Sequence, residues 1–164
     1  MRTVLLVAFI TVSSCLWAQE TYYYTVDPRK DTVLVYDENR NVVILYSKNE
    51  FIFKDMPVRL SRDKKAIVFS GLSGELGRVA SKRYRKIILA DGSEYRISSG
   101  KRNFSYKKNG IRCAGGKYSF TANGGAVVEL YANDSSFLPF LFQTSIAHIK
   151  GTQLAEQLFW INLM

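Results

Sequence analysis

Residues 137–149 read FLPFLFQTSIAHI and carry no formal charge. Asp134, Ser135 or Ser136 can cap the start of a helix here, and Pro139 then falls in the first turn, where a missing N–H is tolerated. A helix of this length is about 20 Å long, whereas a bilayer core is about 30 Å thick. Because a helix that is apolar on all sides must be enclosed, this segment predicts a β shell around a C-terminal helix.

Short β segments separated by turns fill the chain upstream. The strands expected at 32–36 and 42–46 flank a polar loop and form a hairpin. Asp91-Gly92 and Asn109-Gly110 are strong signals for two further hairpins. Roughly ten to twelve short strands with tight turns are typical of a barrel or a sandwich. We therefore expect a mainly β fold, a closed or nearly closed antiparallel barrel with the apolar helix packed in or against it.

The residues after Gly151 have a second apolar pattern. Apolar residues within 153–163 indicate either a second short helix or a continuation of the first. The C-terminal helical segment is therefore placed at 137–164, within a single domain that spans residues 19–164.

The amino terminus has the pattern of an export signal. Met1-Arg2 is followed by an apolar run over 3–12 and a short processing region. Cleavage after Ala18 would remove residues 1–18 and deliver a periplasmic or extracellular protein. Alternatively, residues 12–15 (VSSC) resemble a bacterial lipobox, which would place a lipid on Cys15 and anchor the protein to the cell envelope.

Cysteine and histidine are scarce in the remaining chain. After removal of residues 1–18, Cys113 is the one cysteine left, so an intramolecular disulfide is excluded and the thiol is expected to be a small buried group. His148 is the one histidine in the sequence. The sequence predicts no metal site and no cofactor, and a monomer is favoured over an obligate oligomer.

Positive charge is concentrated in one block of the chain. Residues 78–117 contain twelve Lys and Arg but two acids, a net charge of +10, whereas the whole chain carries +9. Hairpin pairing would gather many of these side chains on one side of the sheet. The candidate binding residues are Arg78, Lys82, Arg83, Arg85, Lys86, Arg96, Lys101, Arg102, Lys107, Lys108 and Arg112.

An electropositive face on an exported domain suits anionic lipid headgroups or envelope glycans. Nucleic acid is not the expected partner, since an exported protein rarely meets it. The competing interpretation is a solvated face whose cations protect sheet edges from aggregation. Under that interpretation the protein is a structural or protein-interaction module of the envelope without a small-molecule ligand.

No combination of residues predicts catalysis. His148 lies within the apolar segment, where a histidine of the core or rim is expected rather than a general base. Asp91 and Glu94 belong to a turn and its flank, where Asp serves the backbone. Glu129 alternates with apolar neighbours and is expected to face solvent. We therefore expect a non-enzymatic protein with no catalytic residue.

Four segments resemble a known family. They are YDENRNVVIL (36–45), SGELGRV (73–79), YSFTANGGAVVEL (118–130) and the apolar run 137–149. Together they are similar to tubby C-terminal-like domains of the LURP-one-related and phospholipid-scramblase-like group. The resemblance implies a twelve-stranded barrel threaded by the C-terminal helix, and some members bind phosphoinositides or other anionic lipids. This chain departs from the family at Arg40, where glycine is usual.

Overall fold

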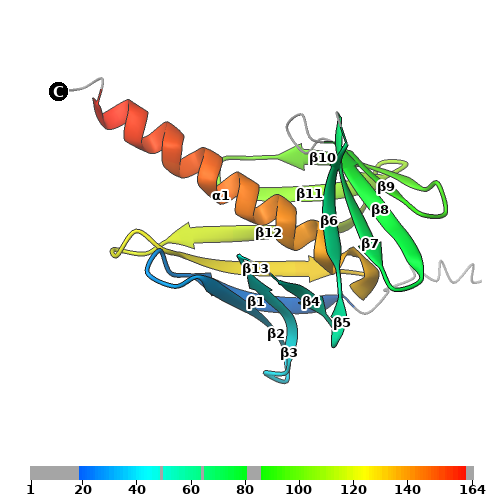
Figure 1. Cartoon of the computed structure of the whole chain (residues 1–164). Coiled ribbons are helices and arrows are strands. Elements are labelled where there is room, and N and C mark those ends of the chain that lie inside the picture. Colours follow the sequence, from blue (N-terminus) through cyan, green and yellow to red (C-terminus); the bar gives the residue numbers. More distant parts are fainter. Residues whose placement is uncertain (1–18, 49, 64, 81–85, 162–164) are drawn as a thin grey trace, which may run out of the picture.

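The computed structural model describes residues 19–48, 50–63, 65–80 and 86–161, with side chains described up to Gln153. Thirteen strands precede one helix (Figure 1). The strands are β1 (Glu20–Val26), β2 (Thr32–Asp37), β3 (Val42–Ser47), β4 (Phe51–Phe53), β5 (Met56–Pro57), β6 (Arg59–Asp63), β7 (Ala66–Gly71), β8 (Gly74–Ala80), β9 (Lys86–Leu89), β10 (Glu94–Ser99), β11 (Asn103–Lys108), β12 (Ile111–Phe120) and β13 (Ala126–Ala132).

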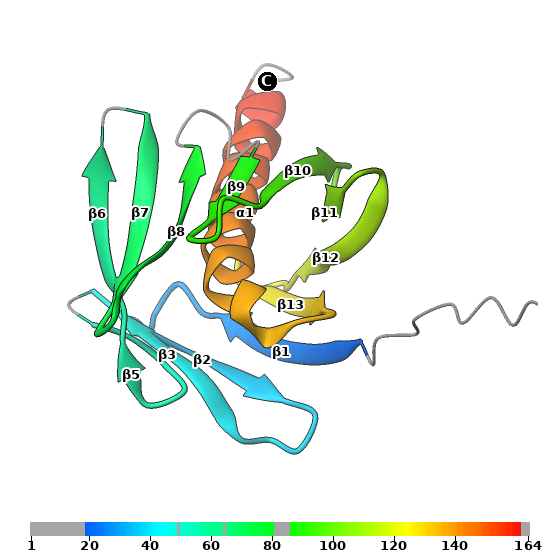
Figure 2. The same cartoon turned by 90° about the vertical axis from the view of Figure 1, so that its right-hand side faces the viewer.

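All thirteen strands belong to one antiparallel sheet that curls into a nearly closed barrel. The order is β5-β4-β3-β2-β1-β13-β12-β11-β10-β9-β8-β7-β6, so neighbouring strands follow the chain except where β1 pairs with β13. The two edge strands, β5 and β6, are separated in the chain by Val58 alone. Figure 2 looks onto one end of the barrel, with the helix inside the curved wall. The predicted mainly β barrel with a C-terminal helix is confirmed.

A single helix supplies the centre of the barrel. A short 3-10 turn, η1 (Ser135–Phe137), leads into α1 (Leu138–Ile161), which has 24 residues. The Asp134 side chain caps this start by accepting a hydrogen bond from the Ser136 N–H at 2.8 Å. The helix continues through Gly151, so the prediction of a continuation is correct and the alternative of a second helix is wrong. Within the described residues, no helix has the length and apolarity needed to cross a membrane.

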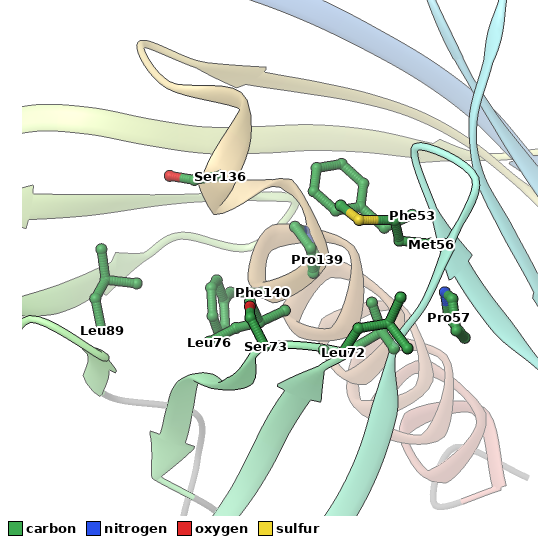
Figure 3. A pocket seen from close by; sticks show the side chains of 12 residues that line it. Phe53, Met56, Pro57, Leu72, Ser73, Leu76, Leu89, Ser136, Pro139 and Phe140 are labelled. Atoms are coloured by element: carbon green, nitrogen blue, oxygen red, sulfur yellow. The ribbon is translucent and has the colours of Figure 1, made fainter.

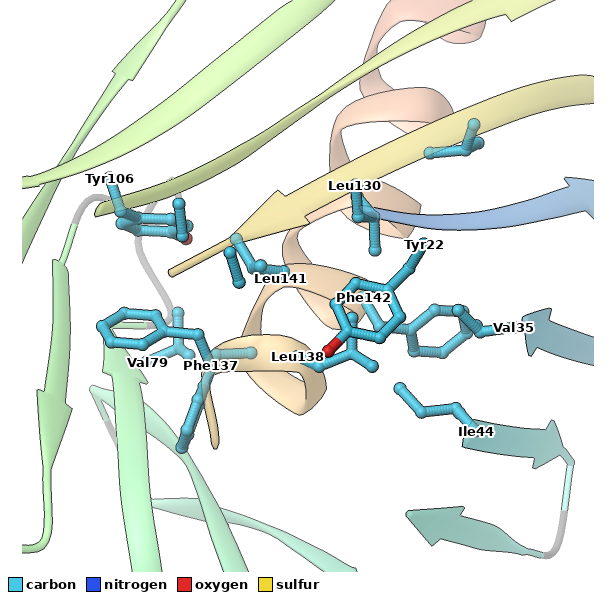
Figure 4. Packing of buried hydrophobic residues seen from close by; sticks show 14 of the residues in the cluster. Tyr22, Val35, Ile44, Val79, Tyr106, Leu130, Phe137, Leu138, Leu141 and Phe142 are labelled. Carbon is cyan, nitrogen blue, oxygen red and sulfur yellow. The ribbon is translucent and has the colours of Figure 1, made fainter. Parts of the chain in front are cut away.

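The inner part of α1 is buried as the apolar segment predicts. Phe140, Leu141 and Ile149 are almost inaccessible, while Ile146 is half-buried. Figure 4 shows Leu138, Leu141 and Phe142 pointing toward side chains from both halves of the wall. Complete burial of each such side chain is worth about 1.5–3 kcal/mol. The hydrophobic core is therefore the contact between helix and barrel, not a contact between two sheets.

The turns divide into two groups at opposite ends of the barrel. The strand registers place one group of turns at the barrel end where the helix begins, which we call the helix-start end. These turns are residues 38–41, 54–55, 72–73, 90–93, 109–110 and 133–137. The helix leaves through the other end (Figure 1). Arg40 has φ 64°, a left-handed conformation that favours glycine. Arg40 therefore adopts the backbone conformation that a glycine would readily adopt.

Candidate anion-binding surface

Four cations form one line across four neighbouring strands. In the antiparallel registers Lys86 on β9 faces Arg96 on β10, Arg96 also faces Lys107 on β11, and Lys107 faces Arg112 on β12. We call Lys86, Arg96, Lys107 and Arg112 the cation row. Directly opposed residues share one face of a sheet, and adjacent strands lie about 4.8 Å apart, so the row extends over about 14 Å.

The row lies on the outer wall of the barrel. Arg96, Lys107 and Arg112 are exposed, while Tyr95 and Tyr106, one position earlier on β10 and β11, are buried. The alternation of side chains along a strand therefore separates an aromatic interior from a cationic exterior. A β-bulge between Tyr106 and Lys107 shifts the register, and this shift places Lys107 opposite Arg112.

An acidic side chain pairs with the cation at only one end of the row, Lys86. Lys86 forms an ion pair with Glu94, and the Arg112 guanidinium lies 4.3 Å from the centre of the Tyr131 ring. Among the residues that the structure describes, no carboxylate pairs with Arg96 or Lys107. Like charges directly opposite each other destabilise a sheet. The cations of the row therefore repel one another, and a bound anion would reduce this repulsion.

Two other candidate cations are engaged elsewhere. Arg78 donates two hydrogen bonds to Glu75, at 2.9 and 2.8 Å, and this pairing raises the pKa of the guanidinium. Lys108 donates to the Ser93 hydroxyl at 2.9 Å and lies 5.4 Å from the centre of the Tyr95 ring. Neither side chain belongs to the row.

Of the remaining predicted cations, the two that the structure describes, Lys101 and Arg102, are not brought to the row. Lys101 and Arg102 lie in the turn between β10 and β11, at the barrel end opposite the start of the helix. The Arg102 guanidinium lies 5.3 Å from the centre of the Phe120 ring. Lys82, Arg83 and Arg85 lie outside the described residues, as do the signal segment 1–18 and Cys15. Among the described residues, the cationic surface is therefore narrower than the sequence predicts for the block 78–117.

The carboxylates expected to have ordinary structural roles do have them. Asp91 accepts hydrogen bonds from the Ser93 N–H at 2.8 Å and from its hydroxyl at 3.1 Å, and these bonds lower the pKa of the Asp91 carboxyl. Glu129 pairs with Lys117 at 3.0 Å. These acids are committed to a turn and to an ion pair and do not converge on a shared site.

His148 and Cys113 are packing residues. The imidazole of His148 stacks on Phe104, with ring centres 5.2 Å apart, and burial lowers the pKa of the imidazole. Cys113 is a free thiol that packs against the core; it is half-buried, where the sequence predicts a small buried group. Within the described part of the chain, no three His, Cys, Asp or Glu side chains are grouped to hold a metal ion.

Comparison with known proteins supports the fold alone. No protein-family model matches the sequence, and no curated protein matches it. A solved structure does match: the X-ray structure of a protein from Arabidopsis thaliana has a TM-score of 0.52 and 13% sequence identity. The alignment covers 77% of this chain and 90% of that one. The two proteins therefore share an architecture.

Sequence reasoning missed two features of the surface. The first is the register that selects four cations from eleven, although the Asp91-Gly92 and Asn109-Gly110 turns carry part of that information. The second is an apolar pocket beside the start of the helix, with Lys54 at its rim. Its lining residues come from four distant parts of the chain, so no local sequence pattern predicts the pocket.

Proposed function

We propose that this protein is an exported, non-enzymatic binding module that attaches to anionic lipid headgroups through the cation row. One observation supports this proposal above the rest: Arg96 stands directly between Lys86 and Lys107, and no described carboxylate forms an ion pair with it. Each Lys or Arg near an anionic membrane surface contributes about 1 kcal/mol of attraction, screened within a Debye length of about 8–10 Å. Membership of the tubby C-terminal-like group belongs to the same proposal, together with export of the chain after Ala18 or lipidation at Cys15.

The test is co-sedimentation with vesicles of phosphatidylcholine alone and with 30% phosphatidylglycerol, at low and physiological salt. We expect binding to the anionic vesicles that falls steeply with salt. The double variant Arg96→Gln/Lys107→Gln should bind about thirtyfold more weakly, which corresponds to about 2 kcal/mol. The matched control is Arg29→Gln/Lys30→Gln, which removes the same charge from an exposed turn between β1 and β2.

Two results would reject the proposal. One is absence of binding at low salt. The other is equal weakening by the two double variants, because binding would then follow total charge and not the row. Retention of the protein on an immobilised anionic polysaccharide, with loss in the row variant, would assign the row to an envelope glycan instead.

The second candidate is a structural or protein-interaction module of the envelope. The ion pairs Arg78–Glu75 and Lys117–Glu129 favour it, because they show cations of the basic block serving the sheet itself. It predicts no affinity for anionic vesicles at any salt concentration. Mass spectrometry of the secreted protein would determine whether the chain begins at Gln19 or carries a lipid on Cys15.

A further inference from the structure

An apolar pocket of about 290 Å³ opens at the helix-start end of the barrel. This volume is just below the usual range for small-ligand sites, which is about 300–1,000 Å³. In Figure 3, Pro139 and Phe140 of α1 lie between Phe53, Met56 and Pro57 on one side and Leu76 and Leu89 on the other. The other lining residues are Val58, Gly71, Leu72, Ser73 and Ser136.

The mouth of the pocket leaves apolar side chains in contact with water. Leu72 is 80% exposed and Met56 is 52% exposed, and both belong to the lining. Leu72 lies in the turn between β7 and β8, and Met56 follows the turn between β4 and β5. Exposed apolar residues around an apolar pocket indicate a ligand site. A bound ligand would remove both Leu72 and Met56 from water.

One cation, Lys54, lies beside the lining residues without being one of them, and this edge of the pocket is called the rim. The Lys54 ammonium donates a hydrogen bond of 2.7 Å to the Ser135 hydroxyl, and Ser136, the next residue, lines the pocket. Among the described residues, no carboxylate forms an ion pair with Lys54. The nearby Asp134 side chain is bound to the Ser136 N–H, where it caps the start of the helix. Beside an apolar interior, the edge of the pocket therefore carries the Lys54 ammonium and the Ser135 hydroxyl, with the exposed Asp55 carboxylate in the same turn as Lys54.

The backbone that carries Lys54 is strained. Lys54 and Asp55 have φ values of 48° and 61°, in a two-residue turn that favours Asn-Gly over side chains of this kind. Left-handed conformations of non-glycine residues cost about 1–2 kcal/mol each. Strain of this kind concentrates at ligand sites, and here it holds the ammonium against the start of the helix.

We propose that this pocket binds one unbranched acyl chain with its carboxylate at Lys54. The apolar lining takes the chain, and the single rim cation matches the single charge of a fatty-acid headgroup. The site is separate from the cation row, so it stands whether or not the row binds membranes.

The probe is dodecanoate, titrated by calorimetry below its micellar concentration, with dodecanol and hexanoate as reference ligands. We expect one site per chain. Dodecanol, which lacks the charge, should bind about tenfold more weakly, as should dodecanoate to Lys54→Met, because a hydrogen bond to a charged group is lost. Hexanoate should bind more weakly than dodecanoate, since a shorter chain buries less apolar surface.

Three variants separate the pocket from its surroundings. Gly71→Ile fills the pocket, since a Cβ at Gly71 would lie 3.5 Å from Leu76 Cδ2, an ordinary contact. Leu72→Glu places a negative charge at the mouth on a side chain too exposed to affect folding. Both should lose most of the dodecanoate affinity. The matched control, Ile111→Glu, alters a 71% exposed residue of the same barrel end that does not line the pocket.

The row variant Arg96→Gln/Lys107→Gln should bind dodecanoate as the unaltered protein does. The proposal is overturned if dodecanoate does not bind, or if dodecanol binds equally well. It is also overturned if Leu72→Glu and Ile111→Glu have equal effects.

Discussion

The Tyr24 hydroxyl on β1 hydrogen-bonds the Ser145 hydroxyl on α1, across 121 positions of sequence and within the buried core. Ser145 donates its own proton to the carbonyl oxygen of Phe142 at 2.7 Å, so Tyr24 is the donor of the pair. Thr144, the neighbouring helix residue, bonds the Tyr106 hydroxyl at 2.5 Å. Two adjacent helix hydroxyls thus tie α1 to β1 and to β11, two strands of the wall that β13 and β12 separate, and set the depth of the helix.

The direction of the Tyr24–Ser145 bond makes the two deletions unequal. Ser145→Ala should destabilise the fold by about 1–3 kcal/mol, because the buried Tyr24 hydroxyl loses its acceptor. Tyr24→Phe should cost only about 0.5–1.5 kcal/mol, because Ser145 keeps its bond to Phe142. Urea unfolding of both variants measures the difference. Equal losses would contradict this account of the Tyr24–Ser145 bond.

Gly77 permits the close approach of β8, β9 and the helix. A Cβ at this position would lie 2.7 Å from the Ile88 carbonyl oxygen and 3.0 Å from Phe140 Cζ. Gly77→Ala should therefore destabilise the protein by about 1–3 kcal/mol through overpacking. Gly71→Ala on β7 is the control, since its Cβ makes ordinary contacts and should change the melting temperature little. Similar losses in both would contradict this account.

Gly151 is a weak point in the helix. It is exposed, and a Cβ there would meet no heavy atom within 4 Å. Gly151→Ala should raise the free energy of unfolding by about 0.5–1 kcal/mol, because alanine loses less backbone entropy in a helix. Helicity measured by circular dichroism should rise as well. A drop in stability would mean that the helix needs flexibility at this point.

His148 predicts how stability depends on pH. Burial lowers the pKa of its imidazole below the ordinary value of 6.5. As the pH falls below 6.5, the unfolded chain takes up the proton first, so stability decreases with acidification until the folded pKa is reached. The melting temperature should therefore fall between pH 7 and pH 5.

The variant His148→Phe keeps a ring against Phe104 and removes the titration. In this variant the melting temperature should change less between pH 7 and pH 5. The carboxyls of Asp37 and Asp91, whose pKa values hydrogen bonds lower from 3.8, act at more acidic pH. An equally steep decline in the His148→Phe protein would assign the pH dependence to other groups.

Arg96 should act oppositely on stability and on binding. Because Lys86 and Lys107 flank it directly, Arg96→Gln should stabilise the isolated protein by about 0.2–1 kcal/mol through relief of repulsion. The same substitution should weaken attachment to anionic vesicles. Thermal unfolding with and without vesicles measures both effects. Destabilisation by Arg96→Gln would indicate that the side chain serves the sheet.

Much of this architecture follows from local signals. The uncharged run 137–149 and the hairpin turns at Asp91-Gly92 and Asn109-Gly110 suffice to predict a barrel around a helix, because each reflects a short-range requirement. The continuity of the helix through Gly151 was not decidable, since an exposed glycine costs only about 1 kcal/mol. The strand β5 is two residues long and carries no period at all.

The surface depended on information that is not local. Whether Lys107 faces Arg112 or its neighbour is decided by one β-bulge, and a shift of one residue moves every side chain to the other face. The pocket depends on where the start of the helix meets the β4–β5 and β7–β8 turns, which is a property of the assembled barrel.

The pairing of β1 with β13 determines when the protein can fold. Val26 faces Ala126 and Glu20 faces Ala132, so β1 must wait for at least 100 further residues before its partner β13 exists. The helix that fills the core is made later still. A growing chain therefore has no interior to collapse onto until the residues of α1 have been made, and contacts this distant in sequence make folding slow. We expect the barrel to stay unfolded until that point, and during this interval its apolar strands are exposed to proteases and chaperones.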